Sequence, residues 1–186
     1  MLKRNILLCS LAVLVAAVSS CIFDPAPTPP VVKPPVQSFK PLTEKENVLN
    51  NMEVAYNKRR PDKYNELLDD AFTFFYTAGD VGGGEVPVQW NRPVEVTTTE
   101  GLLADADKID MDIRTENGLT WVEVTPENTP DERWYTTTLY YEFTIDIGET
   151  TYIPESGAKA QFTVRNAGTT DAPDWRLVEF RDLGGV

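Results

Sequence analysis

The stretch AYNKRRPDKYNELLDDAFTFF, residues 55–75, predicts three consecutive elements and sets the class of the fold. Its first residues end a helix in a polar turn. Pro61 or Asp62 suits the first turn of a second, short helix. Proline is tolerated there because the first backbone N–H groups of a helix have no partner within the helix. Tyr64, Leu67 and Leu68 share one face of that helix. The aromatic run AFTFFYT then has the composition of a strand.

The residues before this stretch extend its first helix towards the N-terminus. Thr43 and Glu46 have the spacing of a capping box, which predicts that the helix starts near Thr43. Apolar residues then recur at helical spacing and form one stripe: Val48, Leu49, Met52, Ala55 and Tyr56. Asp69 and Asp70 follow the second helix, where we expect one to cap a turn and the other to be solvated.

The residues after this stretch predict one more helix and then only strands. A helix is expected from Pro93 to about Leu103. Alternating residues indicate strands in DKIDMDIRT, LTWVEVT, RWYTTTLYYEFTIDI, AKAQFTVRNAG and DWRLVEFRDL. Helices followed by an antiparallel meander are typical of an α+β domain with helices packed on one curved sheet.

Two segments resemble the NTF2-like superfamily, also called SnoaL-like or ketosteroid-isomerase-like. Residues 55–75 are similar to its N-terminal signature, in which an acidic pair leads from a short helix into the first strand. The final WRLVEFRDL is similar to its closing strand. The resemblance implies an α+β cone over residues 42–186, with about three N-terminal helices on a strongly curved antiparallel sheet and a pocket at the wide end. Relatives include isomerases, dehydratases, cyclases and binding proteins, so the fold implies no particular reaction.

The known catalytic residues of this superfamily are not found in the sequence. An ungapped overlay of the signature places Met52 where the isomerases have a tyrosine, and Tyr76 where they have an aspartate base. The chain also contains no histidine. No catalytic residue is therefore predicted, and a protein without enzymatic activity is favoured. The alternative is an isomerase or dehydratase whose base is a carboxylate with a pKa raised by burial.

The resemblance also suggests where a ligand would bind. Four aromatic residues are placed in the pocket wall: Tyr56, Phe74, Tyr76 and Trp90. Asp80 and Glu85 flank the Gly82–Gly84 loop and are placed at the pocket rim. A small apolar or cationic ligand is therefore expected.

The sequence predicts neither a metal nor a cofactor. Gly82–Gly84 lacks the Gly-Lys-Ser/Thr ending of a phosphate loop. The acidic run DADKIDMD, residues 105–112, lacks the glycine and the distal glutamate of a calcium-binding EF-hand loop. Its second half alternates like a strand with one solvated face.

The N-terminal residues predict a lipoprotein. Residues 1–20 combine Lys3 and Arg4 with an apolar run, as in a signal peptide, and VSSC, residues 18–21, resembles a bacterial lipobox. Lipidation is expected at Cys21, and the proline-rich residues 21–41 are expected to form an extended linker. This implies a protein attached to a membrane of the bacterial cell envelope on its extracytoplasmic side. Ile22 in place of aspartate favours the outer membrane.

The net charge of the chain limits the classes of molecule that it is expected to bind. The chain has 17 basic and 29 acidic residues and a net charge of −12, which argues against binding to nucleic acid. We expect binding of a small ligand or assembly with other proteins. A third hypothesis is a structural envelope component that forms a homodimer through the outer face of its sheet.

Overall fold

The computed structural model describes residues 38–77, 87–115, 118–126, 129, 132–153 and 157–184. The predicted signal peptide, Cys21 and most of the linker lie outside these residues, as do Asp80, Glu85 and the glycine loop. Val36–Val186 form one compact unit.

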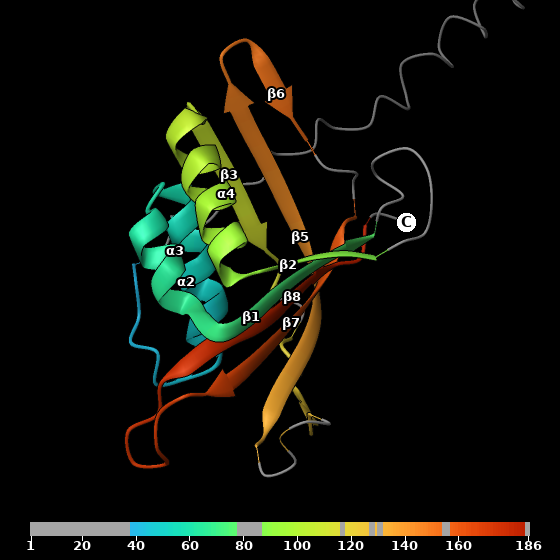
Figure 1. Cartoon of the computed structure of the whole chain (residues 1–186). Coiled ribbons are helices and arrows are strands. Elements are labelled where there is room, and N and C mark those ends of the chain that lie inside the picture. Colours follow the sequence, from blue (N-terminus) through green and yellow to red (C-terminus); the bar gives the residue numbers. More distant parts are fainter. Residues whose placement is uncertain are drawn as a thin grey trace, which may run out of the picture. The chain divides into compact units, whose positions relative to one another are not determined.

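The domain places its described helices on one side of a strongly curved sheet (Figure 1). The helices are α2 (Glu46–Asn57), α3 (Pro61–Leu67) and α4 (Arg92–Asp105). The strands are β1 (Leu68–Thr77), β2 (Pro87–Asn91), β3 (Lys108–Ile113), β4 (Val122–Val124), β5 (Trp134–Ile147), β6 (Thr150–Tyr152), β7 (Lys159–Asn166) and β8 (Trp175–Asp182). This is the α+β arrangement predicted from the sequence.

The strands follow the order β2-β1-β8-β7-β5-β3, and β4 and β6 pair with β5. All pairs are antiparallel except β1 with β8, which run parallel, so the sheet is mixed. The long strand β5 changes partners along its length. Its first half pairs with β4 and β7, and its second half pairs with β3 and β6. This change of partners divides the sheet into two differently directed parts, which Figure 1 shows crossing each other.

The apolar stripe of α2 packs against the concave face of the sheet. Its five predicted residues are all buried: Val48, Leu49, Met52, Ala55 and Tyr56. They join one core with inward-facing residues of the sheet such as Phe72, Phe162 and Leu177.

The start of α2 differs from the capping-box prediction. The helix begins at Glu46, and its N-cap, Lys45, has helical backbone angles and makes no side-chain cap. The carbonyl of Leu42 instead accepts a hydrogen bond from the N–H of Trp175, at 2.8 Å. The preceding chain is therefore tied to β8, and Thr43 lies in a turn outside the helix.

Three asparagines tie residues 38–41, the end of the predicted linker, to α2. The side chain of Asn51 donates to the carbonyl of Lys40 and accepts from its N–H, both at 2.8 Å. Asn47 donates to the carbonyl of Pro41 at 2.8 Å, and Asn50 to that of Ser38 at 3.2 Å. These four residues are therefore attached to the folded domain.

The turn after α2 ends the helix as the sequence indicated. Arg59 adopts a left-handed conformation, with φ of 49°, and the N–H of Arg60 returns to the carbonyl of Ala55 at 2.8 Å. Arg59 is held there by its side chain, which donates to the carbonyl of Ala106 at 2.5 Å.

The second helix is shorter than predicted. It ends at Leu67, and β1 begins at Leu68, three residues before the predicted strand. Leu68 therefore belongs to a strand, because it pairs with Leu177 of β8. The segment LTWVEVT also forms less strand than predicted, since only Val122–Val124 pairs with β5.

Candidate functional site

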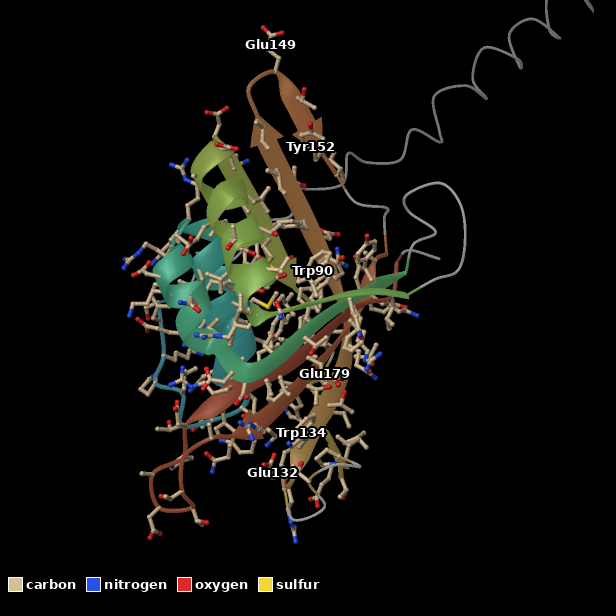
Figure 2. All side chains as sticks on the ribbon, in the orientation of Figure 1. Trp90, Glu132, Trp134, Glu149, Tyr152 and Glu179 are labelled. Carbon is tan, nitrogen blue, oxygen red and sulfur yellow. The ribbon has the colours of Figure 1, made fainter. Side chains whose placement is uncertain are left out.

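A cavity of about 190 Å³ lies between the helices and the concave face of the sheet. Six aromatic side chains line it: Tyr56, Phe74, Trp90, Tyr141, Phe143 and Phe180. They come from α2, β1, β2, β5 and β8, so the cavity exists only when these elements are assembled. Figure 2 labels Trp90, which lies on β2, near the middle of the domain and beside the lower end of α4.

Strand register brings several of these rings together. Phe74 is opposite Trp90 on β2 and opposite Phe180 on β8. Directly opposed residues point to the same face of a sheet. The rings of Phe74 and Trp90 stack with centroids 4.5 Å apart, and Phe180 meets Phe74 edge-on at 4.9 Å. Tyr56 meets Phe143 edge-on at 5.5 Å. The cavity therefore has a wall of aromatic rings that contact one another.

A buried carboxylate, Glu95 of α4, borders this cavity and is only 4 % exposed. It accepts hydrogen bonds from the Tyr64 hydroxyl at 2.7 Å, from Trp90 Nε1 at 2.6 Å and from Thr99 Oγ1 at 3.1 Å. Glu95 lies in the first turn of α4, where the helix dipole favours a negative charge. Hydrogen bonds to a carboxylate are stronger than those between neutral groups. These contacts hold a buried negative charge without a lysine or arginine partner among the described residues.

Two tyrosines connected to Glu95 remain protonated at neutral pH. Burial raises the pKa of Tyr56 above its usual value, and the charge of Glu95 raises it further. Burial also raises the pKa of Tyr64, with Tyr56 and Glu95 as further causes. The Tyr56 hydroxyl is 3.4 Å from Thr99 Oγ1, which itself donates to Glu95. Both phenols are therefore neutral hydrogen-bonding groups.

The structure places the residues predicted for the pocket wall as follows. Tyr56, Phe74 and Trp90 line the cavity. Tyr76 is not among its lining residues, but its ring lies 5.4 Å from that of Trp90 and 6.4 Å from that of Phe74. The two residues predicted for the rim lie outside the described residues.

Glu95 was not predicted as a site residue, although the sequence contains a signal for it. Glu95, Thr99 and Leu103 are spaced four residues apart, and these are the buried residues of α4. A charged residue at the start of such an inward-facing row needs a polar environment inside the fold. Asp182, at the end of β8, also borders the cavity and accepts a hydrogen bond from the N–H of Gly184 at 3.0 Å.

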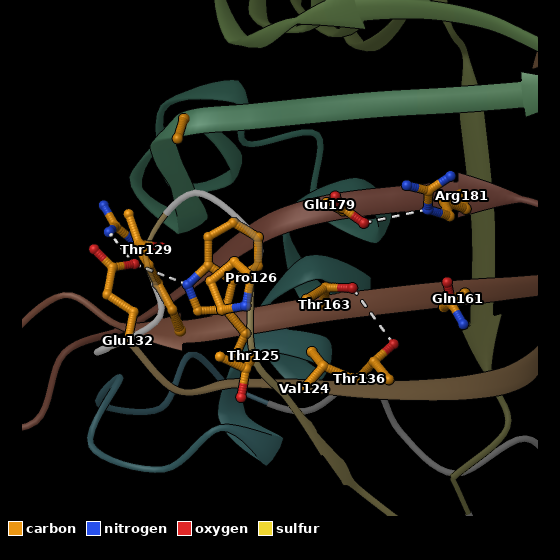
Figure 3. Close-up of a pocket in the computed structure, with 13 residues that line it drawn as sticks. Val124, Thr125, Pro126, Thr129, Glu132, Thr136, Gln161, Thr163, Glu179 and Arg181 are labelled. Carbon is orange, nitrogen blue, oxygen red and sulfur yellow. Dashed lines mark hydrogen bonds and ion pairs between the residues drawn. The ribbon is translucent and has the colours of Figure 1, made fainter.

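A larger groove of about 860 Å³ lies beside the outward-facing residues of β5, β7 and β8 (Figure 3). Its charged lining residues all take part in ion pairs: Glu132, Arg165, Glu179 and Arg181. Arg165 donates to both carboxylate oxygens of Asp69, at 2.7 and 2.9 Å, and to Glu132 at 3.0 Å. Glu179 accepts from Arg181 at 3.2 Å. These charges are neutralised within the domain, so the groove has less to offer an ionic ligand than the cavity.

The two adjacent aspartates have the contrasting environments that were predicted, but both lie in β1. The side chain of Asp69 is buried and accepts from the N–H of Ala71 at 2.9 Å. The side chain of Asp70 is 99 % exposed.

Neither a metal site nor a membrane-spanning helix is found in the described part of the chain. No group of three or more histidine, cysteine, aspartate or glutamate residues there is arranged to hold a metal ion. No described helix is long and apolar enough to cross a membrane. The acidic run extends from the last residue of α4 through a short connection into β3, and Asp107 in that connection accepts from the N–H of Gly148 at 2.8 Å.

No protein-family model and no curated protein matches this sequence. Solved structures do match the fold. A scytalone dehydratase-like protein of Novosphingobium aromaticivorans aligns over 76 % of this chain and 81 % of its own, with 10 % identity and a TM-score of 0.56. An NTF2-like superfamily protein of Salmonella enterica serovar Typhimurium aligns over 76 % of this chain and 88 % of its own, with 11 % identity and a TM-score of 0.53. The domain therefore has the NTF2-like fold.

Proposed function

We propose that this protein is a lipoprotein of the bacterial cell envelope whose NTF2-like domain binds a small ligand in its interior cavity. The observation that carries the binding role is the aromatic cavity with Glu95 at its wall. The lipobox-like VSSC at residues 18–21 and the proline-rich segment after it support the anchored location.

The size of the cavity limits its ligand. One water takes about 30 Å³ in the liquid, so about 190 Å³ suits a ligand of roughly six to ten non-hydrogen atoms. Pockets for drug-sized molecules are larger, about 300–1,000 Å³. The ligand is therefore a compact molecule, such as a single ring with a short substituent.

Native mass spectrometry tests the binding role. The domain, purified gently from cells, should carry a small molecule that leaves when the protein is denatured. Repeated preparations without any retained or added small ligand would contradict the proposal. A bare dimer in the same spectra would support the structural envelope component instead.

The anchor has its own test, in which a bacterial host expressing the full chain is fed a labelled fatty acid. The label should enter the protein, and Cys21→Ala should abolish its incorporation. Cys9→Ala is the matched control, because Cys9 lies inside the predicted signal peptide. Equal labelling of the Cys21→Ala protein would overturn the lipid anchor without affecting the ligand proposal.

The second candidate function is an isomerase or dehydratase that uses Glu95 as its base. It is favoured by the position of this buried carboxylate at the cavity, with the neutral Tyr64 and Thr99 as neighbouring hydrogen-bond donors. Any substrate turnover should then fall at least about a hundredfold in Glu95→Gln, which lacks the base. Glu100→Gln, an exposed change on the same helix, should retain activity. Turnover that survives in Glu95→Gln would exclude this role.

A further inference from the structure

We infer that the ligand of the interior cavity is a compact organic ammonium ion, held by the charge of Glu95 and by the surrounding aromatic rings. This inference rests on the proposed function, because it assigns a chemical class to the ligand. It requires an excess of negative charge at the cavity, aromatic rings in the cavity wall, and space for a small molecule.

The described residues that line the cavity include two carboxylates, Glu95 and Asp182, and no lysine or arginine. Tyr56, which also lines it, is uncharged at neutral pH because burial raises the pKa of its hydroxyl. Electrostatic interactions are stronger away from water. The excess of negative charge at the cavity therefore favours a cation and disfavours a carboxylate or phosphate ligand.

Among the described residues, Glu95 has no lysine or arginine partner, and it has room for another hydrogen bond. Its Oε1 accepts from Tyr64 and Thr99, whereas Trp90 is the one donor to its Oε2 in the described part of the chain. A carboxylate offers about four acceptor positions, two on each oxygen. An ammonium N–H could therefore bind at Oε2 without displacing a protein donor. Burying a charge without a counter-charge is costly, so a bound cation would offset a cost that the free protein bears.

The aromatic wall provides the second attraction. A cation over the face of a tryptophan, tyrosine or phenylalanine ring is stabilised by the negative face of that ring. The cation–π contacts between described residues involve other rings, namely those of Phe39, Phe75, Tyr135, Tyr140 and Trp175. The rings of Phe74, Trp90 and Phe180 at the cavity are not among them.

Two pairs of small molecules test the effect of ligand charge while the shape of the ligand stays nearly the same. Choline and 3,3-dimethyl-1-butanol have almost the same shape, but only choline is charged. Benzylamine, protonated at neutral pH, and benzyl alcohol form a second pair, in which the cation can donate N–H bonds. Titration calorimetry would use the mature chain from residue 21 onwards, with Cys21→Ser to prevent lipidation. We expect at least one cation to bind about tenfold or more tightly than its neutral partner.

Substitutions of acidic residues test which carboxylate causes the preference for the cation. Glu95→Gln should remove most of the preference for the cation while the neutral partner still binds. Glu100→Gln removes the same charge from the exposed face of α4 and should keep the preference. Since Glu95→Gln could unfold the domain, Asp182→Asn at the half-buried edge of the cavity is a second variant, expected to reduce the preference by a smaller factor.

Equal or tighter binding of both neutral probes would overturn the ammonium assignment and leave the binding role intact. Absence of binding by all four probes would also overturn it, and the native mass spectrum would then decide the binding role independently. A cation preference unchanged in both Glu95→Gln and Asp182→Asn would show that the cation binds elsewhere.

Discussion

The guanidinium of Arg165 on β7 donates two hydrogen bonds to the carboxylate of Asp69 on β1, at 2.7 and 2.9 Å, across the intervening strand β8. The Asp69 side chain is 2 % exposed and that of Arg165 is 26 % exposed. Glu132 provides a second carboxylate for Arg165. The pair therefore connects two strands that do not pair with each other.

Removing either partner of this ion pair should have unequal effects. Arg165→Met leaves the buried Asp69 carboxylate without its cation and should lower the free energy of unfolding by about 3–5 kcal/mol. Asp69→Asn should cost less, about 1–3 kcal/mol, because Arg165 keeps Glu132 and partial contact with water. Urea denaturation would measure both changes.

The matched control is the neighbouring pair of Arg181 and Glu179, whose side chains are 38 % and 25 % exposed. Glu179→Gln should change the free energy of unfolding by about 1 kcal/mol or less. A similar small loss in Arg165→Met would contradict a structural role for the Asp69–Arg165 pair.

Asn57, the last residue of α2, should be more important for stability than its exposed neighbours in sequence. Its side chain donates to the carbonyl of Met111 at 2.8 Å and accepts from the N–H of Met111 at 2.7 Å. Asn57→Ala removes both bonds that join the helix to β3, so we expect a loss of about 2–3 kcal/mol by thermal or chemical denaturation.

Asn50→Ala is the control for this prediction, since Asn50 makes longer contacts of 3.2 and 3.1 Å. Its loss should remain below about 1 kcal/mol. If the two variants were equally stable, Asn57 would not anchor α2 to the sheet.

Above about pH 10, the buried tyrosines should make stability fall as pH rises. Burial raises the folded-state pKa of Tyr56, so an unfolded chain releases its proton at a pH where the folded protein keeps it. The stability that this pKa difference contributes is fully present below the pKa of Tyr56 in the unfolded chain. It is lost as the pH rises towards the pKa of Tyr56 in the folded protein.

Tyr56→Phe should therefore reduce the fall in the free energy of unfolding above pH 10 by up to about 1.4 kcal/mol per pH unit. The measurement is a series of urea denaturations across this range. Tyr152→Phe is the comparison, because Tyr152 is 55 % exposed, and it should leave the slope unchanged. Identical slopes in wild type and Tyr56→Phe would rule out this origin of base sensitivity.

Replacing either of two glycines by alanine should change the stability of the domain, in opposite directions at the two positions. Gly101 lies within α4, and a Cβ there meets nothing within 4 Å, so Gly101→Ala should stabilise the domain by about 0.5–1 kcal/mol. At Gly168, between β7 and β8, a Cβ would collide with the carbonyl oxygen of Ala172 and lie 2.8 Å from the nitrogen of Asp174.

Gly168→Ala should therefore destabilise the domain, by about 1–3 kcal/mol if the turn must shift. Melting temperatures of the two variants provide the test, and each serves as the control for the other. A Gly168→Ala protein at least as stable as wild type would show that this turn can relax freely.

The sequence alone was sufficient to predict the three helices, most of the strands and the class of the fold, but not the short strands β2 and β6. The stripe from Val48 to Tyr56, the polar turn at residues 57–60 and the alternation in β5 are encoded by residues close in sequence. Such patterns depend on the fixed periods of helix and strand. The similarity of residues 55–75 to the NTF2-like signature then indicated the cone.

Tertiary structure decided the features that depend on distant partners. Leu68 belongs to β1 because it pairs with Leu177, and the turn before α2 is tied to Trp175. Glu95 became a site residue because Tyr64 and Trp90 converge on it from α3 and β2. The free energy of a buried charge depends on the donors that surround it, and for Glu95 the folded chain brings those donors together from separate elements.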